Sequence, residues 1–233
     1  KAPGNWGFFL LENNKILERK NAIVLLLVAG AMWSLGGLLI KSIPWHPLAI
    51  SGMRGGIAAV VIYAFSKDKK INITYDKLLA ACFYTLVVTL FVIANKLTTA
   101  GNAILLQYTA PVYVALFGYM FLGEKSTFID WITIFILLGG LTLFFLDDLS
   151  FDGYLGNALA ILSGMSFAAL TISLRKQKDN NPSDSILLGN ILTLIIGLPI
   201  IISETSFNLH STILILVLGI IQLGVPYIFY TTA

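Results

Sequence analysis

The chain has 233 residues, of which 57% are hydrophobic and 12% are charged, and its formal net charge at pH 7 is +3. A soluble domain carries roughly 25% charged residues, and a chain of this length cannot hide so much apolar surface from water, so the composition excludes an ordinary soluble enzyme or binding domain. The single cysteine, Cys82, excludes a disulfide framework and a cysteine-based metal site built from this chain alone.

The first segment, residues 1–20, is expected to lie outside the main fold. Residues 5–11 are apolar but too few to span a bilayer, and no small-residue cleavage site follows them, which argues against a cleaved signal peptide. For residues 1–12 a leader, an interfacial segment and an artificial extension all stay open. The remainder is a basic stretch expected on the cytoplasmic side.

Eight apolar stretches follow, each long enough for a spanning helix, which needs about 20 residues. The short loops between them favour sequential antiparallel helices and leave no room for a soluble domain. The sequence therefore predicts an all-α integral membrane protein, a multi-spanning helix bundle. The eight spans are predicted at residues 22–43, 47–66, 77–95, 100–122, 128–146, 155–174, 185–202 and 211–230.

Basic residues occur mainly in alternate connecting segments, as the positive-inside rule requires of cytoplasmic loops. The other face has only Lys41 and Lys96 as basic residues. We therefore expect the N-terminus inside, in the cytoplasmic (inner) membrane of a prokaryote. The basic residues on the expected inner face are Lys15, Arg19, Lys20, Lys67, Lys69, Lys70, Lys77, Lys125, Arg175, Lys176 and Lys178. The acids on the other face are Asp147, Asp148, Asp152 and Glu204.

The second half of the chain weakly repeats the first. A constant shift places Gly30 on Gly164, Trp33 on Phe167 and Lys41 on Arg175, and a similar shift places residues 98–100 on residues 231–233. A five-helix unit crosses the membrane an odd number of times, so its copy must be inverted, and inverted repeats are a recurring architecture of secondary transporters. We expect inverted five-helix repeats over residues 21–150 and 151–233. The second repeat is incomplete because it stops after its third helix.

Several motifs resemble one transporter family. Residues 103–116, AILLQYTAPVYVAL, followed by LGEK at residues 122–125, resemble the fourth-helix signature of the EamA family in the drug/metabolite transporter superfamily. Residues 30–34, GAMWS, resemble its first-helix motif, and residues 224–233 resemble the end of its eighth helix. The resemblance implies ten helices around a central cavity lined mainly by helices 1, 3, 4, 6, 8 and 9, often used to export amino acids or related metabolites. This chain departs from that pattern by ending before helix 9.

Polar and aromatic side chains inside apolar spans are expected to face the bundle interior, because lipid offers them no hydrogen-bond partners. There they serve either interhelical packing or contact with a substrate. Aromatic walls with sparse polar groups suit an amphipathic organic molecule better than a bare ion. The candidates for substrate binding are Trp33, Ser34, Tyr84, Gln107, Tyr108, Ser166, Gln222 and Tyr227.

Arg54 lies well within the second span, where a charge costs at least about 2.5–3.5 kcal/mol. It is either a counter-charge for an anionic or zwitterionic substrate, or an arginine that reaches carbonyls or the interface beside a packing surface formed by Gly52 and Gly56. Pro111 and Pro226 each remove a backbone hydrogen bond and predict a static kink or a hinge.

These features predict a secondary transporter, most readily an exporter, that moves a small organic metabolite by alternating access. A structural or regulatory membrane subunit is the alternative. No acid falls near the centre of a span, which predicts a facilitator or weakly coupled exchanger unless helices beyond this chain supply one. The two histidines, His46 and His210, lie in loops, so we expect no enzyme, metal or cofactor. The expected partners are a small-molecule substrate and membrane lipid, not nucleic acid, and a homodimer stays open.

Overall fold

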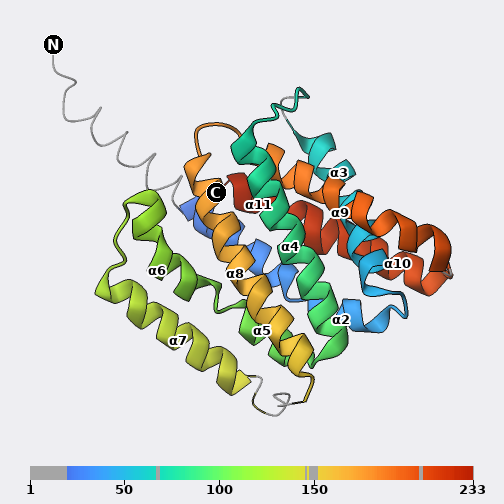
Figure 1. Cartoon of the computed structure of the whole chain (residues 1–233), viewed down its shortest axis with the longest axis horizontal. Helices are drawn as coiled ribbons and strands as arrows, with labels where there is room; N and C mark the ends of the chain where they lie inside the picture. Colours follow the sequence, from blue (N-terminus) through green and yellow to red (C-terminus); the bar gives the residue numbers. More distant parts are fainter. Residues whose placement is uncertain (1–19, 67–68, 145, 147–151, 205–206, 233) are drawn as a thin grey trace.

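The computed structural model describes residues 20–66, 69–144, 146, 152–204 and 207–232. All regular secondary structure in these ranges is helical, which confirms the predicted all-α bundle (Figure 1). The proposed leader at residues 1–12 lies outside the described residues. So do Ala233 and five charged residues used in the orientation argument, namely Lys15, Arg19, Lys67, Asp147 and Asp148.

Five of the predicted spans are single continuous helices. Seven spans in the described part of the chain are long and apolar enough to cross a membrane. The remaining one, α7, has 17 residues, which is the lower limit for a tilted or locally thinned bilayer. The continuous helices are α3 (Pro47–Phe65), α4 (Tyr75–Leu97), α7 (Phe128–Phe144), α8 (Tyr154–Lys176) and α9 (Ser183–Glu204).

The other three spans are interrupted near their middle. The first described span, Lys20–Ser42, turns at residues 34–35 and continues as α2 (Gly36–Ser42). The fourth divides into α5 (Ala100–Gln107) and α6 (Ala110–Leu122). Irregular backbone at membrane depth is tolerated where protein or a water-filled space satisfies its hydrogen bonds, so each interruption is expected to face one or the other.

The eighth span contains a wide turn. It consists of α10 (Leu209–Val217), the π-helical segment η2 (Leu218–Gly224) and α11 (Val225–Thr232). Pro226 is the second residue of α11 and has no N–H to donate to the carbonyl of Gln222, which removes one α-helical bond at the point where the π-helical turn ends. Pro111 has the same place in α6.

Consecutive spans run antiparallel, so the connections gather at two ends of the bundle. At one end the Lys41 ammonium donates to the carbonyl of Thr98 over 2.8 Å, and the Thr98 hydroxyl donates to Asn157 over 2.7 Å. At the other end the Lys176 ammonium lies 5.4 Å from the ring centroid of Phe121. This second end holds the described basic connections, so we call it the basic-rich end; its cytoplasmic placement stays a prediction.

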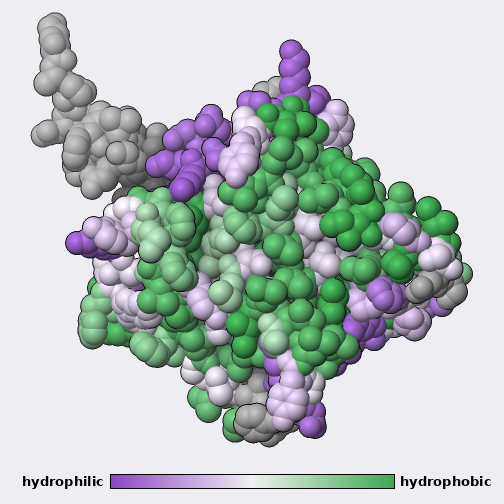
Figure 2. Space-filling model, viewed as in Figure 1, coloured by the Kyte–Doolittle hydropathy of each residue, from purple (hydrophilic) through white to green (hydrophobic). Residues whose placement is uncertain are grey.

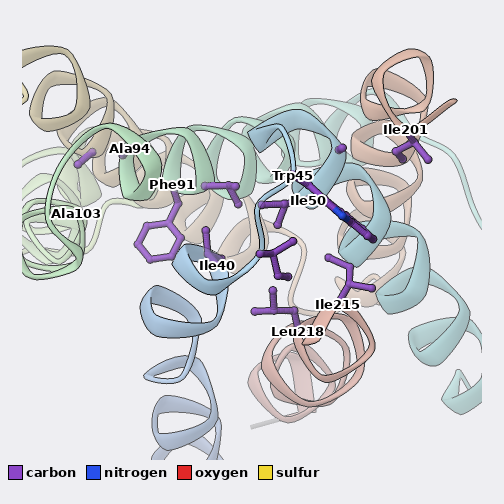
Figure 3. Close-up of a cluster of buried hydrophobic side chains, with 13 residues drawn as sticks. Ile40, Trp45, Ile50, Phe91, Ala94, Ala103, Ile201, Ile215 and Leu218 are labelled. Atoms are coloured by element: carbon purple, nitrogen blue, oxygen red, sulfur yellow. The ribbon is translucent and has the colours of Figure 1, made fainter. Parts of the chain in front are cut away.

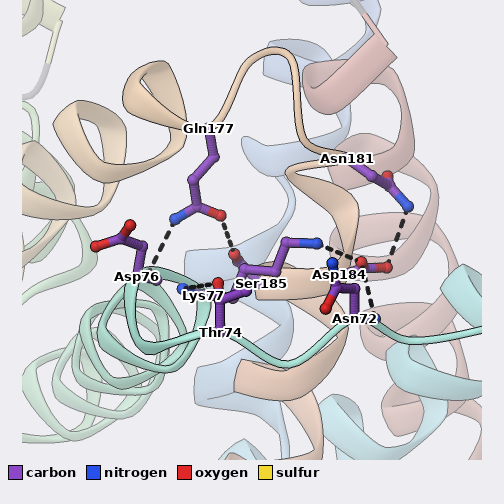
Figure 4. A network of polar contacts seen from close by, with 8 residues as sticks. All are labelled: Asn72, Thr74, Asp76, Lys77, Gln177, Asn181, Asp184 and Ser185. Atoms are coloured by element: carbon purple, nitrogen blue, oxygen red, sulfur yellow. Dashed lines mark hydrogen bonds and ion pairs between the residues drawn. The ribbon is translucent and has the colours of Figure 1, made fainter.

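A buried polar network joins α4 to α9 at the basic-rich end (Figure 4). The Lys77 ammonium lies 2.6 Å from the Asp184 carboxylate, and their side chains are 3% and 5% exposed. The backbone N–H of Asn72 and the side-chain amide of Asn181 also donate to this carboxylate. Lys77 was expected only as one of the basic residues of the inner face, and no sequence pattern predicted its burial against Asp184.

Small residues and aliphatic side chains form the core between the helices. A Cβ atom on Gly52 would lie 2.9 Å from the Cα atom of Gly197, so the backbones of α3 and α9 are in direct contact where the helices cross. A Cβ atom on Gly56, the second glycine of the expected packing surface, would lie 3.0 Å from the side chain of Leu194. Figure 3 shows one apolar cluster where α2, α3, α4 and the eighth span converge, including Ile40, Ile50, Phe91, Ile215 and Leu218.

The outer surface exposes many large hydrophobic side chains. Val60, Phe135 and Leu143 are each about 70% exposed or more, and Figure 2 shows hydrophobic residues over most of one face with hydrophilic residues towards its rim. Water would penalise this surface and hydrocarbon would not. The described helices therefore form a membrane bundle.

Candidate functional site

A cavity of about 1130 Å³ lies among the first span, the fourth span, α3, α4, α7, α8 and the eighth span. All three interruptions meet at its wall: Ser34 lies at the turn in the first span, Tyr108 lies between α5 and α6, and Gln222 lies in η2. Broken helices lining an internal space are the arrangement in which membrane proteins place binding groups at depth.

Glycine lets the broken segments approach one another. A Cβ atom on Gly36 would lie 2.8 Å from Nε2 of Gln222, so the break in the first span fits directly against η2. A Cβ atom on Gly164 in α8 would lie 2.9 Å from the carbonyl oxygen of Gln107, beside the break in the fourth span. That carbonyl is the one that Pro111 leaves without its helical donor.

One wall of the cavity is aromatic. The ring of Trp33 lies edge to face with Phe167 and with Tyr227, at centroid distances of 6.4 and 5.2 Å, and all three residues line the cavity. Tyr230 packs against the same indole at 5.7 Å. Edge-to-face aromatic pairs favour defined ring orientations, so these contacts stabilise the arrangement of the wall.

The cavity lining also carries a few polar groups. The Gln107 amide donates to the Ser163 hydroxyl over 2.8 Å, and that hydroxyl donates to the carbonyl of Val87 over 2.9 Å. Within the described part of the chain, neither the indole N–H of Trp33 nor the hydroxyl of Tyr108 has a hydrogen-bond partner. These two groups therefore keep donor capacity for a molecule inside the cavity.

Arg54 lies at the cavity wall and is only 1% exposed. Its Nη1 atom donates to Oε1 of Gln222 over 3.1 Å, and its Nη2 atom donates to the carbonyl of Val88 over 3.0 Å. The Nε–H has no partner among the described residues. The arginine thus reaches a backbone carbonyl, as the structural interpretation allowed, and does not extend to the membrane interface. Because it also lines the cavity, its interpretation as a counter-charge for a substrate stays open.

The structure brings most of the predicted binding residues together and sets two apart. Trp33, Ser34, Gln107, Tyr108, Gln222 and Tyr227 line the cavity, together with Arg54 and Pro111. Tyr84 does not line it: its hydroxyl donates to Asn190 over 2.9 Å, and its ring supports Tyr227 from behind at 4.9 Å. Ser166 is buried and donates to the carbonyl of Leu162, and Pro226 is buried behind the wall.

The residues predicted from the sequence to bind substrate include none from α7, which forms one wall of the cavity. The family pattern assigns the lining mainly to other helices, yet α7 supplies Asp130, Thr133, Ile134, Leu137 and Leu141. Their spacing of three and four residues marks one helical face. Apart from Asp130 and Thr133 near its start, this face is as apolar as the rest of α7, so hydropathy alone does not distinguish it from the lipid-facing side. Phe167 and Thr171 in α8 and Lys41 in α2 were also not among the predicted binding residues.

A bundle with an apolar outer surface, whose interrupted helices line a cavity, defines a multi-pass membrane protein. The profile of the EamA-like transporter family matches residues 20–146. The chain belongs to that family, and the resemblance drawn from the sequence motifs is confirmed.

Two comparisons extend this assignment. The threonine/homoserine exporter RhtA of Escherichia coli (strain K12) is 26% identical over 190 residues, and RhtA of Salmonella typhimurium (strain LT2) matches equally well; each match covers 76% of this chain. The chain spans 61% of the length of these relatives. The fold is also similar to a solved structure titled "Crystal structure of protein", with a TM-score of 0.72 and 17% sequence identity. The alignment covers 92% of this chain and 78% of that one, and it supports the helical fold described above.

Proposed function

We propose that this protein is a secondary transporter that carries a small amphipathic metabolite, an amino acid or a similar compound, through the cavity by alternating access. The observation that carries the proposal is the meeting of Ser34, Tyr108 and Gln222, each at an interrupted span, around one internal space. A structural subunit has no need of a cavity at this depth, and solid packing would stabilise it better.

The lining favours a molecule with both an apolar and a polar part. Trp33, Phe167 and Tyr227 offer ring edges and faces to hydrocarbon, whereas Gln107 and Tyr108 offer hydrogen-bonding groups. The volume of about 1130 Å³ slightly exceeds the roughly 300–1,000 Å³ of typical ligand pockets, so a small metabolite would share it with water.

The interruptions supply the places where the backbone can bend. Helix segments joined at residues 108–109 and across η2 can rotate with little loss of hydrogen bonding, because Pro111 and Pro226 already lack donors there. Rocking of one half of a transporter against the other around a fixed site is the common form of alternating access. We propose hinge motion at both prolines on this basis.

The relatives support the substrate class and the direction. The matched proteins of E. coli and Salmonella are named as exporters of threonine and homoserine. Both compounds are zwitterions with short polar side chains, which fit a lining of aromatic and amide groups. We therefore propose export across the bacterial inner membrane, with the N-terminus and the basic-rich end on the cytoplasmic side.

The test is efflux from cells that express the full-length protein at matched levels. Cells loaded with L-threonine or L-homoserine should release it faster with the wild-type protein than without it, and Tyr108→Ala should remove most of the difference. Phe135→Ala, a matched aromatic change on the lipid-facing surface, should retain it. If neither L-threonine nor L-homoserine is exported, a full profile of the released metabolites identifies another substrate. Identical profiles with and without the protein would exclude the transporter.

A further inference from the structure

Arg54 is a buried cation whose partners in this structure are neutral. The described residues form two ion pairs, Lys77 with Asp184 and Arg175 with Glu124, and Arg54 belongs to neither. Its two hydrogen bonds go to the side-chain amide of Gln222 and to the carbonyl of Val88. A guanidinium withdrawn from water normally requires an opposite charge, because dipoles alone replace hydration poorly.

The geometry leaves an approach to this cation from the cavity. Arg54 lines the cavity with Gln222, so an occupant that moves the Gln222 amide aside reaches the guanidinium. Its Nε–H is buried and has no partner among the described residues, so the guanidinium keeps unused hydrogen-bonding capacity. The acids that line the same cavity, Glu124 and Asp130, lie at the connection between α6 and α7, and Glu124 is already bound by Arg175. Among the described residues, no acid that lines the cavity is paired with Arg54, so an anionic occupant is the counter-charge for which this lining leaves room.

We propose that Arg54 is the receptor for an anionic group of the substrate, a carboxylate, and that the amide of Gln222 stands in for that group when the cavity is empty. This inference rests on the proposed transport function and names its substrate class. A carboxylate can accept from a guanidinium through two parallel hydrogen bonds, whereas the Gln222 oxygen accepts one. The carboxylate would displace Oε1 of Gln222 and leave Val88 bound.

The position of Gln222 adds a consequence for motion. Gln222 belongs to η2, the wide turn that precedes Pro226, and its Nε2 atom packs against Gly36 at the break in the first span. Release of its side chain from Arg54 would loosen the contact between these two interrupted spans. Binding of the anion is thereby linked to the elements that we propose as hinges.

The test measures thermal stabilisation of the purified full-length protein in detergent by matched compounds. L-Homoserine is compared with homoserine lactone, and L-threonine with threoninol, since each second compound lacks the carboxylate. A panel of the twenty amino acids and simple carboxylic acids extends the search. The acids should stabilise the wild-type protein and their carboxylate-free partners should not. Equal stabilisation by both members of a pair, or none by any acid in the panel, would overturn the inference.

Three variants distinguish a role of Arg54 in binding the anion from a purely structural role. Arg54→Gln should weaken the apparent affinity for acids by about 30-fold or more. Gln222→Glu supplies a permanent internal carboxylate opposite Arg54, so it should raise the thermal midpoint and abolish the response to acids even if Arg54→Gln folds poorly. Arg175→Gln removes an exposed guanidinium and should leave the response unchanged. An undiminished response in Gln222→Glu would contradict the inference.

The outcome also separates this inference from the proposed function. Carboxylate-dependent stabilisation without efflux would leave the Arg54 receptor standing and remove transport. Efflux in which lactone and acid are moved equally well would leave transport standing and remove the receptor.

Discussion

The rings of Trp33 and Phe167 meet edge to face, with their centroids 6.4 Å apart and their planes at 88°. These are the two residues that the weak internal repeat places at equivalent positions of the first and sixth spans. Each therefore contributes to the cavity wall from its own half of the chain. The contact supports the proposal that two inverted units share one central site.

Trp33→Ala should abolish transport without abolishing folding. The substitution removes a ring that three aromatic neighbours hold against the cavity, so the loss falls on substrate contact as well as on packing. We expect at least a tenfold fall in initial efflux rate, with protein that still elutes as a single species in detergent. Trp131→Ala, which removes a ring packed on Phe135 away from the cavity, is the matched control. Wild-type efflux in Trp33→Ala would take this residue out of the site.

Pro111→Ala should slow transport while preserving or raising stability. Alanine restores an N–H that can donate to the carbonyl of Gln107, so α5 and α6 can join into one straighter helix and lose the proposed hinge. Efflux rate and thermal midpoint are measured on the same preparation. Pro199→Ala, in the continuous helix α9, serves as the comparison. Equal efflux rates in both variants and the wild type would argue for a static kink.

Asp184→Ala should destabilise the protein strongly, because it leaves the Lys77 ammonium buried without its charge partner. Loss of one partner of a buried pair costs about 3–5 kcal/mol. The exposed pair between Glu124 and Arg175 gives the contrast, since Glu124→Gln should cost about 0–1 kcal/mol. Unfolding in detergent monitored by circular dichroism compares the two. Similar losses in both variants would mean that the network at the basic-rich end contributes little.

The spans were predictable because lipid imposes a simple condition, a run of about 20 apolar residues for every crossing. The breaks before Pro111 and Pro226 carried a sequence signal, since proline cannot donate. The break at Ser34 carried no specific sequence signal, because Gly36 beside it packs against Gln222, a residue of a distant span.

The candidate site was less predictable because polarity alone does not identify a partner. Tyr84 and Tyr227 are both buried tyrosines within apolar spans, yet Asn190 satisfies the first and the cavity faces the second. The contribution of α7 was hidden by its uniform hydropathy. The pairing of Lys77 with Asp184 joins α4 to α9, which are far apart in sequence, and the positive-inside rule treated Lys77 only as a charge of the inner face.

The most direct test of the central claim is the reactivity of single cysteines at the cavity in a Cys82→Ser background. Ser34 is exposed and lines the cavity, whereas Ser166 on α8 is buried away from it. Ser34→Cys should react with a charged, water-soluble thiol reagent, and a transported metabolite should slow that reaction; Ser166→Cys should stay inert. If Ser34→Cys reacts no faster than Ser166→Cys, or if no exported compound protects it, the cavity is not the path of the substrate.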